Sequence, residues 1–533
     1  MRNCTAVDDA LDRLWQACVW RRLPWTGSRI CDIPMLPRPV WRFADAFLRC
    51  AERCGLPRLD GLPQLVIEAI MESLPQHHYF WRCVTALDMA RRLSSVQAQI
   101  LQIVQLSALV SWERGTPPKL ASEDEAVANL PPFVRLTIDV DGLCKVERLK
   151  ERPRFSRRRF DDRTFVIERI DDLGVSLAMF KNGLLQLSLL EDTEEIKFAV
   201  WDTPTPPDLS RCLVKPKKPL SMHRYHTIDL AAATGLTFFV SAQRLLAVHA
   251  HTRTHPSAMA TYRTLQDVVT RDLKFCLWVY VPLPQGDVVL SCGSIADQDI
   301  PSRTTHRPGG RPCFLIRMRL SGETVVGQYA GEHEFDDDSG ERDDSAASLF
   351  LINRPKHPPK TLVYRTEVNW PMACIFFLTA YSEQGLSRTT ERPWHKPPPH
   401  PYPFWYRHSH APLGEVRQVR VFYRPETKTC MGMLLDYDNG GQRAVGQCRL
   451  HVGPSRTFPR PSFIAFLNLP EYGEGVRVLF GDLPSLDEDE HGNSWCYFAM
   501  AGTLDFWFGP DAAAVSVREG KPIPRETLLK KHG

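Results

Sequence analysis

Residues 175–189 read VSLAMFKNGLLQLSL and contain the clearest folding signal of the protein. Apolar side chains recur at every second position on both sides of Asn182-Gly183, which is the spacing that places them on one face of a strand. Asn-Gly is the residue pair that most readily adopts the positive φ angles of a two-residue hairpin turn. The stretch therefore predicts an antiparallel β-hairpin.

The same strand–turn–strand pattern recurs through most of the sequence after Phe133, with Pro and Gly between the apolar segments. Strands joined by short turns pair antiparallel, so we expect residues 131–533 to be mainly antiparallel β structure. The expected β segments are 133–140, 236–250, 275–290, 314–329, 362–378, 416–423, 433–450, 463–467, 476–479 and 496–508.

Two β-sandwich-like units, 131–346 and 347–533, are the expected arrangement of these strands. An acidic, loop-like stretch at 332–344 divides them, and a proline-rich loop at 392–412 belongs to the second. A single β-propeller is the alternative, although no Trp-Asp dipeptide repeats as it does in many propeller blades.

The first 115 residues show the helical period instead, with apolar side chains three and four positions apart. We expect helices within 8–19, 38–54, 62–74, 79–93 and 98–112. Gly115-Thr116-Pro117-Pro118 stops helix formation and begins a linker, 116–130. The expected fold class is therefore multidomain α+β, with a small helical N-terminal domain before a large β region.

Composition excludes several classes of protein. The 66 Lys and Arg residues nearly balance the 62 Asp and Glu residues, leaving a net charge of +4, whereas a dedicated nucleic-acid binder usually has a large basic excess. No apolar run approaches the ~20 residues of a membrane-spanning helix. The 15 cysteines include no Cys-x-x-Cys pair and no secretory signal precedes them, so we expect reduced thiols in the cytoplasm or nucleus and no zinc site.

Residues 61–74, GLPQLVIEAIMESL, form the most informative helix. Pro63 fits the first turn, where its missing N–H costs nothing. Gln64, Glu68 and Glu72 form one polar stripe, and apolar residues cover most of the remaining circumference. That arc is wider than docking on a single core requires, so the helix is either deeply buried or shared with a partner.

The Leu-Pro start, the broad apolar helix, the leucine at its end and the following Trp81 resemble an F-box. The wider sequence is similar to a family of filamentous-fungal F-box-like proteins. The segments that carry this resemblance are FWR at 80–82, SWERG at 111–115, GLTFF at 235–239, VHAHT at 248–252, MGML at 431–434 and YDNG at 437–440.

The resemblance implies a non-catalytic substrate-recognition subunit of an SCF-type ubiquitin ligase. The F-box helices would dock on a Skp-type adaptor and so join a cullin ligase, while the β region would hold an unknown protein substrate. By position, adaptor binding is assigned to Leu62, Pro63, Leu65, Val66, Ile70, Leu74 and Trp81. The alternative is a stand-alone β-rich protein that binds a peptide or carbohydrate and whose F-box-like helices are only structural.

Signatures of catalysis are absent: the sequence has no phosphate-binding loop, no Gly-x-Ser-x-Gly elbow and no His-Glu-x-x-His. His249 and His251 lie two apart on an expected strand and so share a face, which is half of a metal site or of a hydrolase site if carboxylates join them. Structural histidines are the preferred interpretation. We therefore expect no catalytic residues, no metal and no cofactor, and interpret the basic segments 152–159 and 215–218 as solvated loops.

Overall fold

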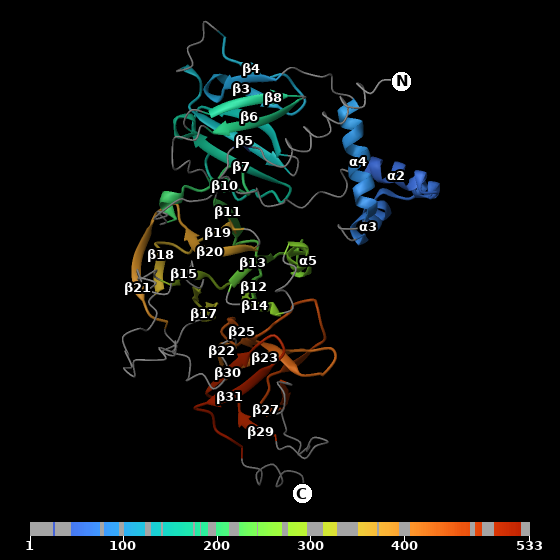
Figure 1. Cartoon of the computed structure of the whole chain (residues 1–533). Coiled ribbons are helices and arrows are strands. Elements are labelled where there is room, and N and C mark those ends of the chain that lie inside the picture. Colours follow the sequence, from blue (N-terminus) through green and yellow to red (C-terminus); the bar gives the residue numbers. More distant parts are fainter. Residues whose placement is uncertain are drawn as a thin grey trace, which may run out of the picture. The chain divides into compact units, whose positions relative to one another are not determined.

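The computed structural model describes residues 25–26, 44–74, 79–94, 101–122, 129–139, 142–173, 176–181, 183–189, 199–212, 223–241, 244–268, 275–295, 313–327, 350–369, 372–393, 406–469, 475–481 and 495–523 (Figure 1). The protein divides into two compact units. The first comprises Met1–Pro207 with Pro216–His226, and the second comprises Asp208–Lys215 with Thr227–Gly533.

The first unit begins with a group of short helices. These are α2 (Ala44–Arg53), the 3-10 turn η2 (Pro57–Gly61), α3 (Gln64–Ser73) and α4 (Tyr79–Ser94). Phe47, Met71 and Val84 from the three α-helices are each at most 2% exposed and form their common core. The helices expected within 38–54, 62–74 and 79–93 are thus confirmed for the described residues. The helix expected at 8–19 lies outside them.

The helix expected at 98–112 is wrong. This segment forms the strands β2 (Gln102–Gln105) and β3 (Leu109–Glu113), joined by the 3-10 turn η3 (Leu106–Ala108). Leu106, Leu109 and Trp112 are all buried, and their spacing of three imitates a helical face because the tight turn sits between the strands. Pairing of β2 with β8 and of β3 with β6 overrides that local pattern.

The remainder of the first unit is β structure. One sheet contains β10, β7, β5, β6, β3 and β4 in that order, and a second contains β1, β9, β8 and β2. Leu136, Val166 and Leu187 from both sheets are at most 1% exposed and share a core. The elements are β1 (Trp25–Thr26), β4 (Lys119–Leu120), β5 (Phe133–Asp139), β6 (Gly142–Leu149), β7 (Arg163–Arg169), η5 (Ile170–Leu173), β8 (Ser176–Lys181), β9 (Leu184–Leu189) and β10 (Ala199–Trp201).

The hairpin expected at 175–189 is confirmed. Strands β8 and β9 pair antiparallel with Lys181 opposite Leu184, and Gly183 has a φ of 70°. Within the expected linker 116–130, Lys119 and Leu120 form β4, which pairs with β3, while 123–128 lie outside the described residues. The strand β11 (His223–Asp229) leads into the second unit.

The second unit is almost entirely strands, with one described helix, α5 (Met259–Val268). Its elements before residue 400 are η6 (Leu209–Arg211), β12 (Gly235–Ser241), β13 (Arg244–His251), β14 (Leu277–Pro282), β15 (Val289–Ile295), β16 (Phe314–Met318), β17 (Gly322–Val326), β18 (Phe350–Pro355), β19 (Thr361–Asn369), β20 (Met372–Tyr381) and β21 (Leu386–Glu391). The later ones are β22 (Arg407–Pro412), β23 (Val416–Tyr423), β24 (Cys430–Tyr437), β25 (Gln442–Gly446), β26 (Ser455–Pro459), β27 (Phe463–Asn468), β28 (Val476–Gly481), β29 (Cys496–Ala499), β30 (Thr503–Phe508) and β31 (Ala513–Arg518).

These strands form several sheets, none of which closes among the described residues. Their orders are β13-β12-β14, β17-β16-β15-β18-β21, β22-β30-β31 and β26-β23-β24-β28-β27-β29, with β25 on β24. The expectation of a large, mainly antiparallel β region is confirmed. The expected division at 346–347 and the acidic stretch at 332–344 lie outside the described residues. Strands β15 and β18, from either side of it, pair with each other, and one buried cluster extends from Ile228 to Val515.

The end of the proline-rich segment 392–412 is also a strand rather than a loop. Residues 394–405 lie outside the described residues, whereas Arg407–Pro412 forms β22 and pairs with β30. His408 contacts the Trp507 ring at a centroid distance of 4.5 Å and Ala411 is fully buried, so packing selects the extended conformation here. Within the described part of the protein, no helix is both long and apolar enough to cross a bilayer.

Candidate functional site

The helix α3 has two apolar sides with different surroundings. Ile67 and Met71, four positions apart, are 3% and 1% exposed and pack into the helical core. Leu65 and Val66 are 79% and 43% exposed, and Leu62 just before the helix is 37% exposed. The described residues therefore leave this side of the helix exposed.

The seven residues assigned to adaptor binding fall into two groups. Leu62, Pro63, Leu65 and Val66 lie at the surface, and we call them the α3 surface. Ile70, Leu74 and Trp81 pack against the helical core and are partly buried. The Trp81 indole Nε1 donates a hydrogen bond to the Leu74 backbone oxygen at 3.4 Å, which ties the end of α3 to α4.

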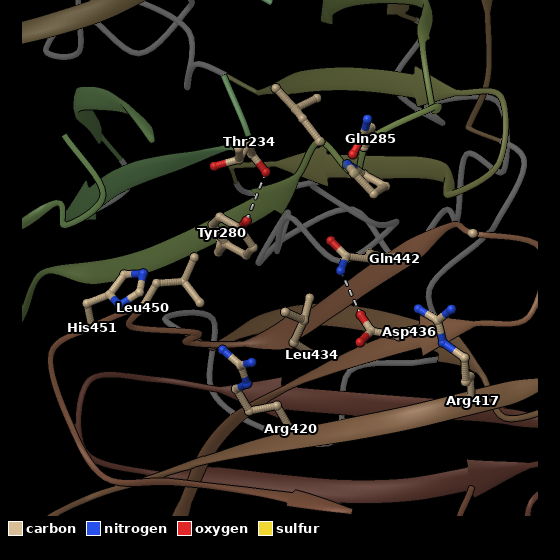
Figure 2. Close-up of a pocket in the computed structure, with 13 residues that line it drawn as sticks. Thr234, Tyr280, Gln285, Arg417, Arg420, Leu434, Asp436, Gln442, Leu450 and His451 are labelled. Carbon is tan, nitrogen blue, oxygen red and sulfur yellow. Dashed lines mark hydrogen bonds between the residues drawn. The ribbon is translucent and has the colours of Figure 1, made fainter. Parts of the chain in front are cut away.

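A second site is an open cleft of about 520 Å³ in the second unit (Figure 2). Its volume lies within the range of ligand-binding pockets, roughly 300–1,000 Å³. The cleft is formed by segments far apart in sequence: strands β23 and β24 lie opposite the start of β12 and the end of β14 (Figure 2). The lining residues are Thr234, Tyr280, Leu283, Pro284, Gln285, Arg417, Arg420, Leu434, Asp436, Gly440, Gln442, Leu450 and His451.

The floor of the cleft is apolar and buried. Tyr280, Leu434 and Phe422 are 4%, 8% and 2% exposed and pack together with Cys448. The Tyr280 hydroxyl donates a hydrogen bond to the Thr234 backbone oxygen at 3.2 Å. Burial raises the pKa of Tyr280 well above its usual range, so this hydroxyl stays protonated. A Cβ at Gly235 would meet the Tyr280 ring, so glycine is needed for this packing.

Two arginines and one carboxylate provide the charge of the cleft. Arg417 lies in a β-bulge, where it is the extra residue between Val416 and Gln418, and Arg420 follows on the same strand. Neither guanidinium forms an ion pair with an acidic residue in the described part of the protein. The Asp436 carboxylate instead accepts hydrogen bonds from Gln442 Nε2 at 2.7 Å and from Gln418 Nε2 at 3.2 Å.

Hydrogen bonds from neighbouring turns hold the rim of the cleft in place. The Asp287 carboxylate accepts bonds from the Leu320 N–H, the Ser321 N–H and the Ser321 hydroxyl at 2.8, 2.8 and 2.6 Å. The same hydroxyl oxygen accepts the Gln442 N–H at 3.0 Å, so the β16–β17 turn fixes the start of β25.

The YDNG turn that contributes to the sequence resemblance borders this cleft. Gly440 has a φ of 85°, a conformation that glycine adopts without strain. Asn439 Oδ1 accepts the Gly441 N–H at 2.7 Å, and the Gly440 N–H is donated to the Tyr437 oxygen at 3.0 Å. The turn therefore has a structural role at the cleft, because it connects the Asp436 end of β24 to Gln442.

His249 and His251 share a face of β13 as expected, and their ring centroids are 4.8 Å apart. His251 Nδ1 donates to the Pro256 oxygen at 2.8 Å, which leaves Nε2 to accept the Thr237 hydroxyl at 2.7 Å. His249 Nε2 donates to the His255 oxygen at 3.1 Å, and its Nδ1 accepts the Thr261 hydroxyl at 2.9 Å. A threonine hydroxyl is thus donated to one ring nitrogen of each histidine.

The other candidate groups are likewise engaged locally. Arg159 pairs with Asp161 at 3.2 Å and with the buried Asp202 at 3.3 Å, which neutralises part of the basic segment 152–159. The basic segment 215–218 lies outside the described residues. Among the described ranges, no group of three or more His, Cys, Asp or Glu side chains is arranged to hold a metal ion.

Sequence reasoning selected the helix at 62–74 but missed the cleft. Alternation predicts a strand at 416–423, yet it does not distinguish the arginines of this strand from ordinary exposed residues. The one signal in the sequence is the presence of Arg417 and Arg420 on a short strand with no acidic residue between them. Comparison of the sequence and the structure with protein-family models, with curated proteins and with solved structures finds no significant match.

Proposed function

We propose that this protein is the substrate-recognition subunit of an SCF-type ubiquitin ligase, with an F-box-like segment in its helical N-terminal part. The observation that supports this proposal is the exposure of Leu65 at 79% beside Val66 at 43%, on a helix whose opposite side is buried. A Skp-type adaptor would cover these side chains in an apolar groove, the mode in which amphipathic helices commonly bind.

The proposed mechanism needs no chemistry from the protein itself. The α3 surface attaches it to the adaptor and cullin, and the β-rich second unit holds a protein substrate. Recruitment raises the local concentration of that substrate at the ligase, an effect worth orders of magnitude without any new catalytic group.

The test is reconstitution of the full-length protein with a purified Skp-type adaptor, followed by size-exclusion chromatography and calorimetry. Wild type is expected to co-elute with the adaptor. The double substitution Leu65→Asp and Val66→Asp is expected to weaken binding at least 100-fold, because two apolar anchors are replaced by charges that would be buried without partners.

Phe275→Asp is the matched control, since Phe275 is 52% exposed and lies in the second unit. It is expected to leave adaptor binding unchanged. If wild type does not bind the adaptor, the proposal is overturned.

The cleft favours a second candidate function, that of a stand-alone β-rich binding protein whose helices are only structural. Its volume and its combination of an apolar floor with convergent polar groups are typical of a ligand site. This candidate predicts ligand binding in the second unit by a protein that does not associate with the adaptor, so the same reconstitution distinguishes the two.

A further inference from the structure

We infer that the cleft between β23–β24 and the ends of β12 and β14 binds a peptide segment carrying two acidic side chains, held by Arg417 and Arg420. The inference rests on the proposed function in one respect: it identifies the cleft as the place where the ligase subunit would hold its substrate.

The charge of the cleft is the first argument. Arg460, whose backbone N–H is donated to the Arg417 oxygen, pairs with Asp438 at 3.7 Å. Arg417 and Arg420 have no ion pair within the described ranges, although both line the cavity. The Asp436 carboxylate accepts hydrogen bonds from two glutamine amides. The cleft thus offers two guanidinium groups to an anionic ligand.

The position of Arg417 is the second argument. A regular strand would direct side chains 417 and 420 to opposite faces, because successive residues alternate. The bulge between Val416 and Gln418 breaks this alternation, and both arginines line the same cavity (Figure 2). Bulges commonly re-aim a side chain at a functional site. Val419 and Val421 meanwhile stay fully buried on the other face, so the bulge does not disturb the core.

The chemistry of the floor identifies the ligand class. A nucleic acid would present phosphates continuously, whereas the cleft combines two guanidinium groups with an apolar floor. A peptide can place acidic side chains on the arginines and an apolar side chain over Leu434 and Tyr280. Three residue steps along a strand span about 10 Å, and an extended peptide covers that distance in about three residues. Because alternate residues of an extended peptide share a face, the expected ligand has two acidic residues separated by three spacer residues, the middle one apolar.

The test is selection of a randomised decapeptide phage library on the immobilised full-length protein. Recovered sequences are expected to be enriched in Asp or Glu pairs separated by one to three residues. A recovered peptide, synthesised with a fluorescent label, is then titrated against variants. Arg417→Gln and Arg420→Gln are each expected to weaken binding about tenfold, the effect of losing one charge-assisted hydrogen-bonded pair.

Arg244→Gln is the matched control, because Arg244 is an exposed arginine on β13 that does not line the cleft. It is expected to bind the peptide like wild type. A phosphoserine version of the peptide and a single-stranded oligonucleotide of equal charge are titrated in parallel.

Three outcomes overturn the inference: no enriched sequence, enrichment without acidic residues, or equal binding by the Arg417→Gln, Arg420→Gln double variant. Tighter binding of the oligonucleotide than of the peptide overturns it as well. Adaptor binding of the same double variant is also measured and is expected to be unchanged. The Leu65→Asp, Val66→Asp double variant is expected to bind the peptide with the affinity of wild type. Failure of the cleft and failure of the adaptor surface are thus separate results.

Discussion

The α3 surface and the cleft of the second unit, each proposed to bind another molecule, expose different chemistry. The α3 surface offers aliphatic side chains from one continuous segment, with Leu65 largely exposed. The cleft offers Arg417 and Arg420 above an apolar floor assembled from strands far apart in sequence. Proposed binding at the first surface would gain affinity by removing apolar area from water, whereas proposed binding at the second would depend on charge and on a particular tertiary arrangement.

The largest expected effect contrasts the two sides of α3. Met71→Ala is expected to lower the free energy of unfolding of the helical segment by about 2–5 kcal/mol, because Met71 is 1% exposed and its loss leaves a cavity. Leu65→Ala is expected to change it by no more than about 0.5 kcal/mol. Hydrogen exchange of the α2, α3 and α4 amides measures both. A large loss for Leu65→Ala would show that Leu65 is covered by another part of the protein.

The second expected effect is a loss of stability at acid pH caused by His251, which lies on β13 behind the cleft floor. Burial lowers the pKa of His251 from 6.5 to about 4, and its ring lies 5.3 Å from that of Tyr280 in the cleft floor. The folded state therefore prefers neutral His251. Its contribution to stability is present above pH 6.5 and is lost as pH falls toward 4, by about 3 kcal/mol in total.

Chemical denaturation between pH 7 and pH 4 measures this loss. His251→Gln retains one donor and one acceptor but cannot titrate, so its unfolding free energy is expected to fall less steeply over that range than that of wild type. Parallel slopes for the two proteins would show that His251 does not contribute to the acid sensitivity.

The smallest expected effect is a difference in how salt changes the binding affinities of the two surfaces. Raising NaCl from about 50 to about 500 mM is expected to weaken acidic-peptide binding by about fivefold, since screening weakens exposed charge pairs. Adaptor binding through the α3 surface is expected to change less than about twofold, because its contacts are apolar. Fluorescence anisotropy and calorimetry report the two affinities. A salt-independent peptide affinity would contradict the role given to the arginines.

How much could be read from the sequence depended on how local each signal was. The 175–189 hairpin and the helix at 62–74 follow from short-range periodicity and turn chemistry, and both are present. The helix prediction for 98–112 was wrong because the spacing of three arises from a 3-10 turn between strands that pair with distant partners. The loop prediction for Arg407–Pro412 was wrong for a related reason, since pairing with β30 and packing on Trp507 outweighed the effect of the neighbouring prolines.

The sequence by itself determined the β-rich character of the protein, the helices near its start and the breadth of the apolar arc on α3. These properties follow from alternation and helical periodicity, which depend only on neighbouring residues. Tertiary structure alone decided which side of α3 is exposed, since burial of Ile67 and Met71 depends on α2 and α4. It also created the cleft, because a one-residue bulge and the pairing of strands far apart in sequence bring Arg417 and Arg420 to the same cavity.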